Sequence, residues 1–320
     1  MVASPAGSSL CIDAFAVALN QTCDGLHWYT STKELQLASY QFCEACRSVT
    51  ALHLEASNGI PRRLLSAAEE TPEQRRRLTR VPPFRASQVV WDLASSLELR
   101  RPLYVFSDTR SLVFGRDFDD KVEDVVWPPR LRTLAFGSCF SQPISGVSWP
   151  ASLEKLILGG CFNRSISEVA WPPRLRELKF GTSFNLPIDG IAWPASLERI
   201  VFGFRFDQEI DKIVWPESLR QLTFGHHFNR PIDRVAWPRS LRRLVFSGCF
   251  NQAVEEVNWP KSLEQLTFGC YFNMPINGVL WPRSLRQLTF GYYFNQPIVG
   301  IAWPAFLELT FDDRSNQPLE

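Results

Sequence analysis

The chain lacks a long apolar run, a strong net charge and a dense set of cysteines. No apolar run reaches the ~18 residues that a membrane-spanning helix needs, so no such helix is expected. The formal net charge of +1 provides no bulk attraction for nucleic acid or for a membrane surface. Segment 8–19 is mildly apolar, but Asp13 interrupts it and no basic residues precede it, so no signal peptide is expected. These absences favour a cytoplasmic protein.

The sequence does contain a strict repeat of tryptophan followed by proline. Consecutive tryptophans of this repeat are 22 residues apart, and a repeat of this length is typical of a solenoid of short coils. Their regular spacing predicts a structural role for them. They are Trp127, Trp149, Trp171, Trp193, Trp215, Trp237, Trp259, Trp281 and Trp303.

Large apolar residues recur at fixed places when each tryptophan is counted as position one. Leucine holds position five, leucine or isoleucine position eight, phenylalanine most of positions ten and fourteen, and isoleucine or valine positions eighteen and twenty-one. Such constancy indicates side chains that point into one shared interior. The alternation in Leu222-Thr223-Phe224 predicts a short strand with position nine outward. Prolines at positions two and seventeen disfavour helix, so we expect extended chain elsewhere.

Glycine and asparagine follow the predicted strand at constant positions. Glycine holds position eleven in seven units, which suits either a positive φ or a close approach of two backbones. Asparagine at position fifteen is predicted to be buried and to satisfy backbone groups where no strand does so. Asp207 and Ser141 replace it with similar short acceptors. The asparagines are Asn163, Asn185, Asn229, Asn251, Asn273 and Asn295.

The segments Phe228–Ile232 (FNRPI), Phe272–Ile276 (FNMPI) and Phe294–Ile298 (FNQPI) resemble the FNIP repeats, a leucine-rich-repeat-like family. The resemblance covers residues 103–320 and implies a protein-binding solenoid without catalytic residues. Some members of this family join the repeats to an F-box or a kinase domain. The amino-terminal region here shows neither an evident F-box helix pattern nor a glycine-rich kinase loop.

The sequence therefore predicts a mainly β, right-handed, leucine-rich-repeat-like solenoid with one parallel β-sheet. A degenerate first coil at 105–126 precedes eight full coils at 127–302, and 303–320 forms an incomplete last coil that lacks one residue. Residues 1–102 carry no repeat. They are expected to be a small mixed or helical cap and linker, partly helical or disordered.

Cysteine leaves two questions open. Cys43 and Cys46 form a CxxC pair that is compatible either with semi-buried thiols or with a zinc site. Cys139 and Cys161 share one repeat position in adjacent coils, where packed thiols are favoured over a disulfide. A zinc site would need further ligands from Cys11, Cys23, His27 and His53.

Two outward rows are the candidate partner-binding surfaces. We call positions seven and nine the strand face, and positions twelve and thirteen the turn row. The turn row is rich in residue types that dominate protein interfaces. Position six alternates in charge, apart from Arg220 beside Arg242, and is expected to form ion pairs between coils. The strand-face candidates are Lys179, Arg199, Gln221, Arg243, Gln265 and Gln287, and the turn-row candidates are Phe204, Arg205, His226, His227, Tyr271, Tyr292 and Tyr293.

These features favour a non-enzymatic protein–protein interaction module. No Ser-His-Asp order, phosphate loop or paired-carboxylate signature stands out in residues 1–102, so neither catalysis nor a cofactor is expected. A protein partner is predicted, without nucleic acid or membrane. A more specific version is the substrate-recognition arm of a ubiquitin-ligase adaptor. The tyrosines and histidines of the turn row motivate an alternative, a solenoid that binds a glycan or small ligand.

Overall fold

The computed structural model describes residues 10–11, 51–55, 88–92 and 108–312. The chain divides into two compact units, Met1–Phe140 with Val147–Leu153, and Ser141–Gly146 with Glu154–Glu320. The predicted boundary between residues 102 and 103 lies outside the described residues. So do Cys43, Cys46 and the segments expected to be helical or disordered.

The first unit holds five parallel strands in sequence order. The fourth and fifth belong to the 22-residue repeat, since Ser111 is in register with Thr133. The strands at 51–55 and 88–92 were not predicted. The five are β1 (Leu10–Cys11), β2 (Ala51–Glu55), β3 (Gln88–Asp92), β4 (Ser111–Phe114) and β5 (Thr133–Ala135).

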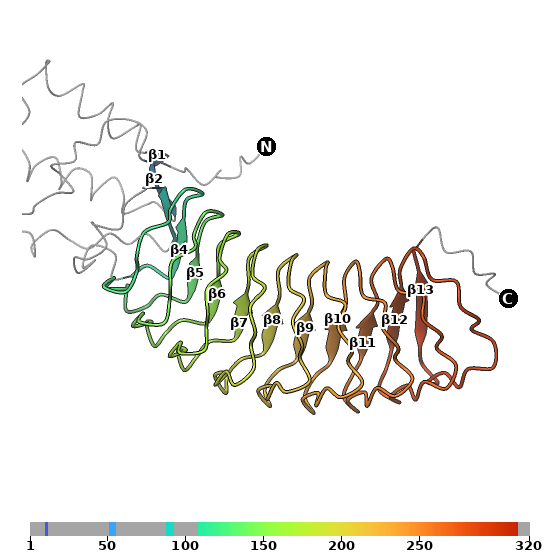
Figure 1. Ribbon diagram of the computed structural model, residues 1–320. Helices are drawn as coiled ribbons and strands as arrows, with labels where there is room; N and C mark the ends of the chain where they lie inside the picture. Colours follow the sequence, from blue (N-terminus) through green and yellow to red (C-terminus); the bar gives the residue numbers. More distant parts are fainter. Residues whose placement is uncertain (1–9, 12–50, 56–87, 93–107, 313–320) are drawn as a thin grey trace, which may run out of the picture. The chain divides into compact units, whose positions relative to one another are not determined.

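The second unit holds eight parallel strands, one per coil, which lie side by side in sequence order (Figure 1). Within the described ranges there is no helix, and hence none that could cross a membrane. The predicted parallel solenoid is therefore confirmed. Its strands are β6 (Lys155–Ile157), β7 (Glu177–Lys179), β8 (Arg199–Val201), β9 (Gln221–Thr223), β10 (Arg243–Val245), β11 (Gln265–Thr267), β12 (Gln287–Phe290) and β13 (Glu308–Phe311).

Residues at the same repeat position pair across neighbouring strands. The Cα partners of Gln221 are Arg199 on β8 and Arg243 on β10. In the last coil Glu308 pairs with Gln287, a spacing of 21 residues, which confirms the missing residue and places it before the strand. The sheet thus consists of rows of side chains that run from coil to coil, and each row is contributed by one repeat position.

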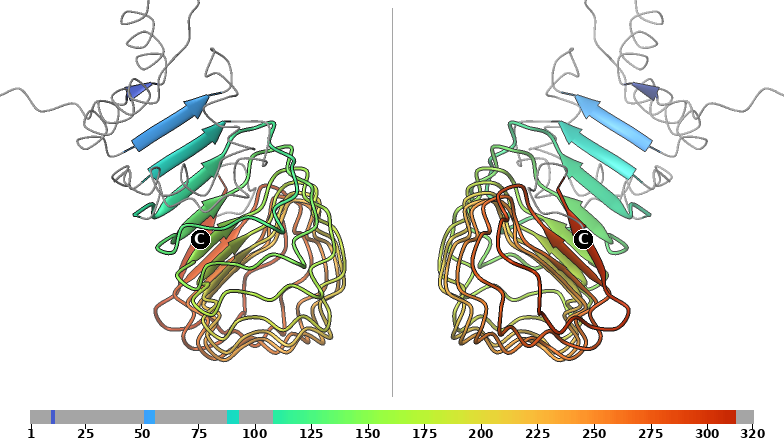
Figure 2. Two further views of the ribbon diagram at one scale, coloured as in Figure 1. Left: turned by 90° about the vertical axis from the view of Figure 1, so that its left-hand side faces the viewer. Right: turned by 90° about the vertical axis from the view of Figure 1, so that its right-hand side faces the viewer.

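Each coil has three sides joined by three tight turns, with the strand on one side (Figure 2). The turns fall at positions three to four, twelve to thirteen, and nineteen to twenty. In the coil that begins at Trp215, each turn is closed by a hydrogen bond from a backbone N–H to the carbonyl three residues earlier, as in β-turns. These bonds are Leu219 to Pro216 at 3.0 Å, Phe228 to Gly225 at 3.3 Å and Val235 to Ile232 at 3.3 Å.

The interior consists of the constant apolar positions, as the repeat predicts. In the same coil Leu219, Leu222, Phe224, Phe228 and Ile232 are all fully buried. The rings of Phe224 and Phe228 stack within the coil at a centroid separation of 4.1 Å, and phenylalanines of successive coils stack on them in turn. No coil completes this core alone, so stability belongs to the stack.

The coils of the second unit form a curved stack, with the strand face on its inner side. In the second unit, rings at position ten, beside the strand, are 5.3–5.9 Å apart from coil to coil. Rings at position fourteen are 6.0–6.2 Å apart. Parallel strands lie about 4.8 Å apart. The coils are therefore closest at the sheet and diverge away from it.

Glycine at position eleven is needed for close backbone approach. A Cβ at Gly225 would overlap the carbonyl oxygen of Gly203 in the preceding coil, and a Cβ at Gly203 would overlap that of Gly181. Positive φ occurs elsewhere, as at Gly190 (φ 69°) in another turn. Close approach of two backbones, and not a positive φ, therefore explains the glycine at position eleven.

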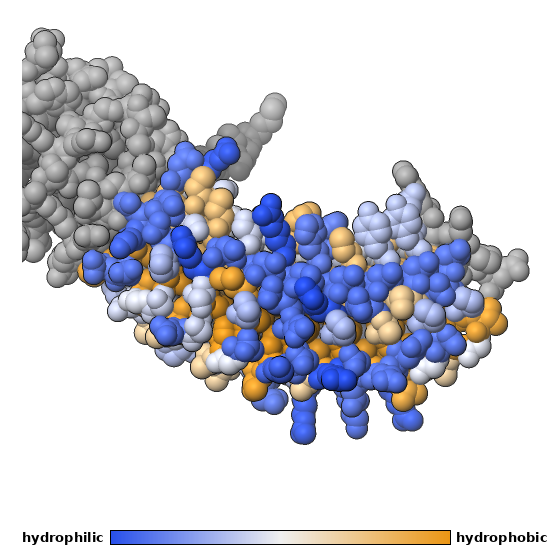
Figure 3. Space-filling model, in the orientation of Figure 1, coloured by the Kyte–Doolittle hydropathy of each residue, from blue (hydrophilic) through white to orange (hydrophobic). Residues whose placement is uncertain are grey.

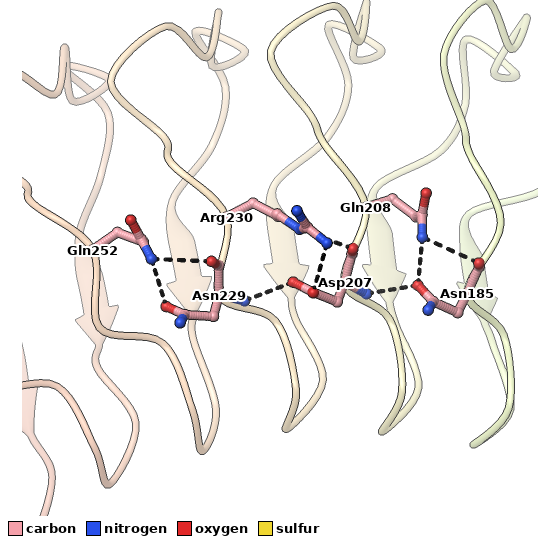
Figure 4. Close-up of polar contacts among 6 residues, drawn as sticks. All are labelled: Asn185, Asp207, Gln208, Asn229, Arg230 and Gln252. Atoms are coloured by element: carbon pink, nitrogen blue, oxygen red, sulfur yellow. Dashed lines mark hydrogen bonds and ion pairs between the residues drawn. The ribbon is translucent and has the colours of Figure 1, made fainter.

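The position-fifteen side chains form a row of acceptors between coils (Figure 4). The backbone N–H of Asp207 donates to Oδ1 of Asn185 at 2.9 Å, and that of Asn229 donates to Oδ1 of Asp207 at 3.0 Å. These side chains satisfy backbone groups between strandless segments. They are exposed or half-buried, however, so the expected burial is wrong. The same contact is made by Asn163, Asn229, Asn251 and Asn273. Asn295, the last asparagine of this row, is exposed.

Two further polar rows were not predicted. At position sixteen, Gln208 donates to both the carbonyl oxygen and Oδ1 of Asn185 (Figure 4). Arg230 donates to the carbonyl oxygen and Oδ2 of Asp207. At position four, Ser218 Oγ donates to the carbonyl oxygen of Leu197 at 2.7 Å. Serines at four other coils of this unit repeat that contact. Each bond joins one coil to the preceding one.

The repeat tryptophans pack as a column of stacked rings. Trp259 and Trp281 lie 6.2 Å apart between centroids, and five tryptophans are buried while the other four are half-buried. The indole Nε1 of each from Trp127 to Trp281 is buried without a hydrogen-bond partner. Burial of the tryptophan rings thus stabilises the fold, whereas the unpaired indole N–H in each coil lowers its stability.

Candidate protein-binding surface

The strand face presents the predicted position-seven side chains on the inner side of the curve. Arg199, Arg243 and Gln287 are exposed, and Gln221 and Gln265 are half-buried. Lys179, at position nine of β7, is exposed as well. All six predicted strand-face residues therefore lie on one continuous side of the second unit.

Some strand-face side chains are engaged with one another. Glu177 lies 3.1 Å from Lys155 and 3.8 Å from Arg199, so one carboxylate serves two cations. Gln265 donates to Gln287 at 2.7 Å. These contacts join adjacent coils, and as exposed pairs each contributes about 0.2–1 kcal/mol at most.

Position six forms fewer ion pairs than its alternating charges predict. Within the second unit Arg176 pairs with Glu198 at 3.7 Å, and Arg242 pairs with Glu264 at 3.0 Å. Arg220 forms no ion pair with any described residue. Its neighbour Glu198 contacts Arg176, in the preceding coil, instead.

The turn row carries an aromatic and histidine cluster beside β8 and β9. The ring of Phe204 stacks on His226 at 4.7 Å between centroids and contacts His227 at 4.6 Å. Phe204 remains 46% exposed, which is high for a phenylalanine. Arg205 and His227 are exposed beside it. The structure thus brings four of the predicted turn-row residues together.

The predicted tyrosines form a second cluster further along the turn row. Tyr271 and Tyr293 stack at 5.0 Å, and Tyr292 meets Tyr293 edge-on at 4.6 Å. About half of Tyr271 and of Tyr293 is exposed. Gly248, between the two clusters, has a φ of 38° and carries no side chain, so the predicted row is divided into two patches.

The cysteines of these turns are free thiols. Among the described residues, Cys139, Cys161, Cys249 and Cys270 form no disulfide, and Cys161 and Cys270 are exposed. Cys249 Sγ lies 3.5 Å from Nδ1 of His226. No group of three or more metal-ligating side chains occurs among the described residues.

The space-filling view of the second unit shows hydrophilic side chains interleaved with smaller apolar areas (Figure 3). Such a mixture is ordinary for interfaces that form and dissociate, which are about as apolar as the remaining surface. The surface can therefore offer both ring faces and charged groups to a partner.

One feature of this surface was not predicted, namely that several of its cations are unpaired. Five cations have no carboxylate partner among the described residues, whereas Arg199 has one. They are Lys179, Arg205, Arg220, Arg243 and Arg286. Repeat positions alone could not predict which cations are unpaired, because each ion pair depends on which of the two neighbouring coils a side chain contacts.

Comparisons with known proteins agree with this architecture. The FNIP repeat model matches residues 140–183, 184–227 and 228–271 in succession. The protein is similar to CroV588, described as a novel circular LRR protein, with 32% sequence identity and a TM-score of 0.58. The match covers 72% of this chain and 41% of CroV588, so this chain spans less than half of that protein.

Weaker similarity links the chain to two bacterial proteins. An internalin from Listeria monocytogenes shows 12% identity and a TM-score of 0.49, with 72% of this chain and 75% of the internalin covered. YopM from Yersinia enterocolitica shows 15% identity and a TM-score of 0.43, with coverages of 95% and 68%. No curated protein sequence matches the chain.

Proposed function

Since residues 140–271 consist of FNIP repeats, we propose that the chain is a non-enzymatic protein-interaction module. It presents the strand face and the turn row of the second unit to a partner protein. The observation that carries this proposal is the cluster of Phe204, His226 and His227, whose rings contact one another and stay accessible. The intact protein acts in the cytoplasm, where its thiols stay reduced.

The clustered rings suit binding because they are held in place before a partner arrives. Phe204 is stacked on His226, and Tyr271 on Tyr293, so little side-chain freedom remains to be lost. Immobilising a free side chain at an interface costs about 0.5–1.5 kcal/mol. Aromatic side chains that avoid this cost are frequent hot spots. The backbone beneath them is fixed by hydrogen bonds between turns, such as His227 N–H to the carbonyl of Phe204 at 2.9 Å.

Affinity purification with two variants of the intact chain tests the proposal. In the first, His226, His227, Tyr271, Tyr292 and Tyr293 are all changed to alanine. In the control, Asp233, Arg234, Glu255 and Glu256, in the turn at positions nineteen and twenty, are changed to alanine. The first variant should lose proteins that the unchanged chain and the control retain. Equal retention by all three would refute the choice of surface.

A more specific form of the proposal is a substrate-recognition arm of a ubiquitin-ligase adaptor. Residues 1–102 would then contact a Skp-type adaptor while the coils hold the substrate. Co-purification of such an adaptor with the intact chain, and its loss on deletion of residues 1–102, would support this form. Retention after the deletion would contradict it.

Glycan binding is a second candidate, favoured by the tyrosine cluster. Tyr271 and Tyr293 offer exposed rings, and Tyr292 lies half-buried in the same patch. Because Tyr271 and Tyr293 stack on each other, each covers one face of the other, which leaves less ring area for a sugar. Binding to a glycan array that disappears when the three are changed to alanine would favour this candidate over a protein partner.

A further inference from the structure

We propose that the partner engages this surface through an extended, acidic segment of its chain, which crosses the strand face beside Phe204. The inference rests on the proposed protein-binding function and adds the chemistry of the partner. Three observations carry it: the charges are unevenly distributed around the coil, five cations on the strand side are unpaired, and the exposed ring of Phe204 follows a strand that lies between those of Lys179 and Arg243.

Positive charge of the second unit is concentrated on the strand side and in the turn at positions three and four just before the strand, which carries Arg174, Arg239, Lys261 and Arg283 against Glu217 alone. Positions six, seven, nine, twelve and thirteen of its coils carry nine cationic side chains and five carboxylates. The turn at positions nineteen and twenty, away from the strand, carries six carboxylates and two cations. A chain with a net charge of +1 has therefore separated its charges by side. Such a field attracts an acidic partner to the strand side and away from the far turn.

Several carboxylates of the strand side are already engaged within the protein. Glu177 contacts Lys155 and Arg199, Glu198 contacts Arg176, Glu264 contacts Arg242, and Glu308 accepts a hydrogen bond from Gln287. Five exposed cations of this side have no carboxylate partner among the described residues, namely Lys179, Arg205, Arg220, Arg243 and Arg286. They need no rearrangement of existing ion pairs before they meet carboxylates of another molecule.

The spacing of the free cations fits an extended peptide. Lys179 lies on β7 and Arg243 on β10, three strand spacings apart in the registered sheet. At about 4.8 Å per strand this is roughly 14 Å, which an extended chain covers with about four to five residues. Phe204 and Arg205 lie at the turn directly after β8, within the same span. A short acidic segment can therefore meet the cations while an apolar side chain packs on Phe204.

A nucleic acid fits these observations less well. The free cations are few, and Glu177, Glu198 and Glu264 lie among them, where each would repel a phosphate backbone. Proteins that bind nucleic acid through phosphates typically make about 6–10 such contacts. Spaced carboxylates on a peptide can place themselves beside individual cations and avoid these three acids.

The test is selection of peptides of about ten residues from a random displayed library on the intact chain. The best peptide is then measured by fluorescence anisotropy against two charge-reversed double variants. One is Lys179→Glu with Arg243→Glu, on the strand face. The other, the matched control, is Lys212→Glu with Arg234→Glu, in the far turn, which changes the net charge equally.

Selected peptides should be rich in Asp and Glu, and their affinity should fall with added salt. The strand-face variant should bind at least about tenfold more weakly than the unchanged chain, and the control within about twofold. Thermal melting of both variants should match the unchanged chain, because all four side chains are exposed.

Four results of the binding measurements would overturn the inference. They are enrichment of neutral or basic peptides, equal weakening by both variants, no enrichment at all, and tighter binding of a single-stranded oligonucleotide of the same length. Self-association of the chain at low salt that the strand-face variant abolishes would assign the charges to a second copy, and would also overturn it. If peptides fail while the aromatic variant still loses captured proteins, the proposed function stands and only the acidic segment is wrong.

Discussion

The side-chain oxygen Oδ1 of Asn229 lies 2.9 Å from the backbone nitrogen of Asn251, at the same repeat position one coil further along. Gln252 donates to that oxygen as well, at 3.0 Å. One asparagine thus joins two coils where no strand does so. The contact explains why short acceptors recur at position fifteen, and why Asp207 can take the place of asparagine there.

Asn229→Ala should lower the free energy of unfolding by about 1 kcal/mol, because the N–H of Asn251 loses its acceptor. Asn229→Asp should retain most of the stability, since a carboxylate accepts the same bonds. Chemical denaturation measures both variants, and amide hydrogen exchange should quicken at Asn251 in the alanine variant alone. Equal losses in the two variants would show that the acceptor is not what matters.

Gly225→Ala should destabilise the protein by about 1–3 kcal/mol, because the new methyl group would overlap the carbonyl oxygen of Gly203. Ser247→Ala is the matched control, because position eleven already carries a side chain in that coil. The control should change stability by less than about 0.5 kcal/mol. A Gly225→Ala protein as stable as the control would refute the close backbone approach.

Trp259→Phe should change stability by less than about 1 kcal/mol, although a large buried ring is replaced. The substitution removes an indole N–H that is buried without a partner, and leaving such a donor unpaired costs about 1–3 kcal/mol. This gain offsets the smaller apolar area of phenylalanine. Trp259→Ala should cost about 3–5 kcal/mol. A phenylalanine variant as unstable as the alanine variant would indicate that the N–H is satisfied in solution.

Phe228→Ala should cost about 3–5 kcal/mol, because its fully buried ring stacks on Phe206, Phe224 and Phe250. Phe204→Ala should cost less than about 1 kcal/mol, since that ring is 46% exposed, but it should weaken partner capture. Thermal unfolding and the capture assay separate the two effects. A reversed order of stabilities would contradict the assignment of interior and surface positions.

The repeat predicts the interior well because a constant apolar position leaves few alternatives. Leu222 and Phe224 could be placed inside, and Thr223 outside, from alternation alone. Glycine at position eleven was predictable as a residue without a side chain, but its reason depends on a backbone in another coil. The strands at 51–55 and 88–92 were not predicted, because they lie outside the 22-residue period.

Polar contacts between coils were less predictable. Position sixteen is occupied by Gln208 and Arg230 but also by Leu186 and Met274, so its hydrogen bonds left no constant pattern in the sequence. The candidate surface was predictable as a set of rows, because rows follow from register. The identity of the unpaired cations was not predictable, because Arg220 is recognised as unpaired only from the contact of Glu198 with Arg176.

The central claim, that successive 22-residue units stack along one axis, is tested most directly by electron spin resonance distances. Native cysteines are replaced by serine, and spin labels are attached to cysteines at exposed position-three sites. Ala195 is paired in turn with Lys261, Arg283 and Ala305, which lie three, four and five coils away. Each added coil should lengthen the separation by about 5–6 Å, between the strand and ring spacings. Separations that fail to grow with the number of coils would contradict the stack.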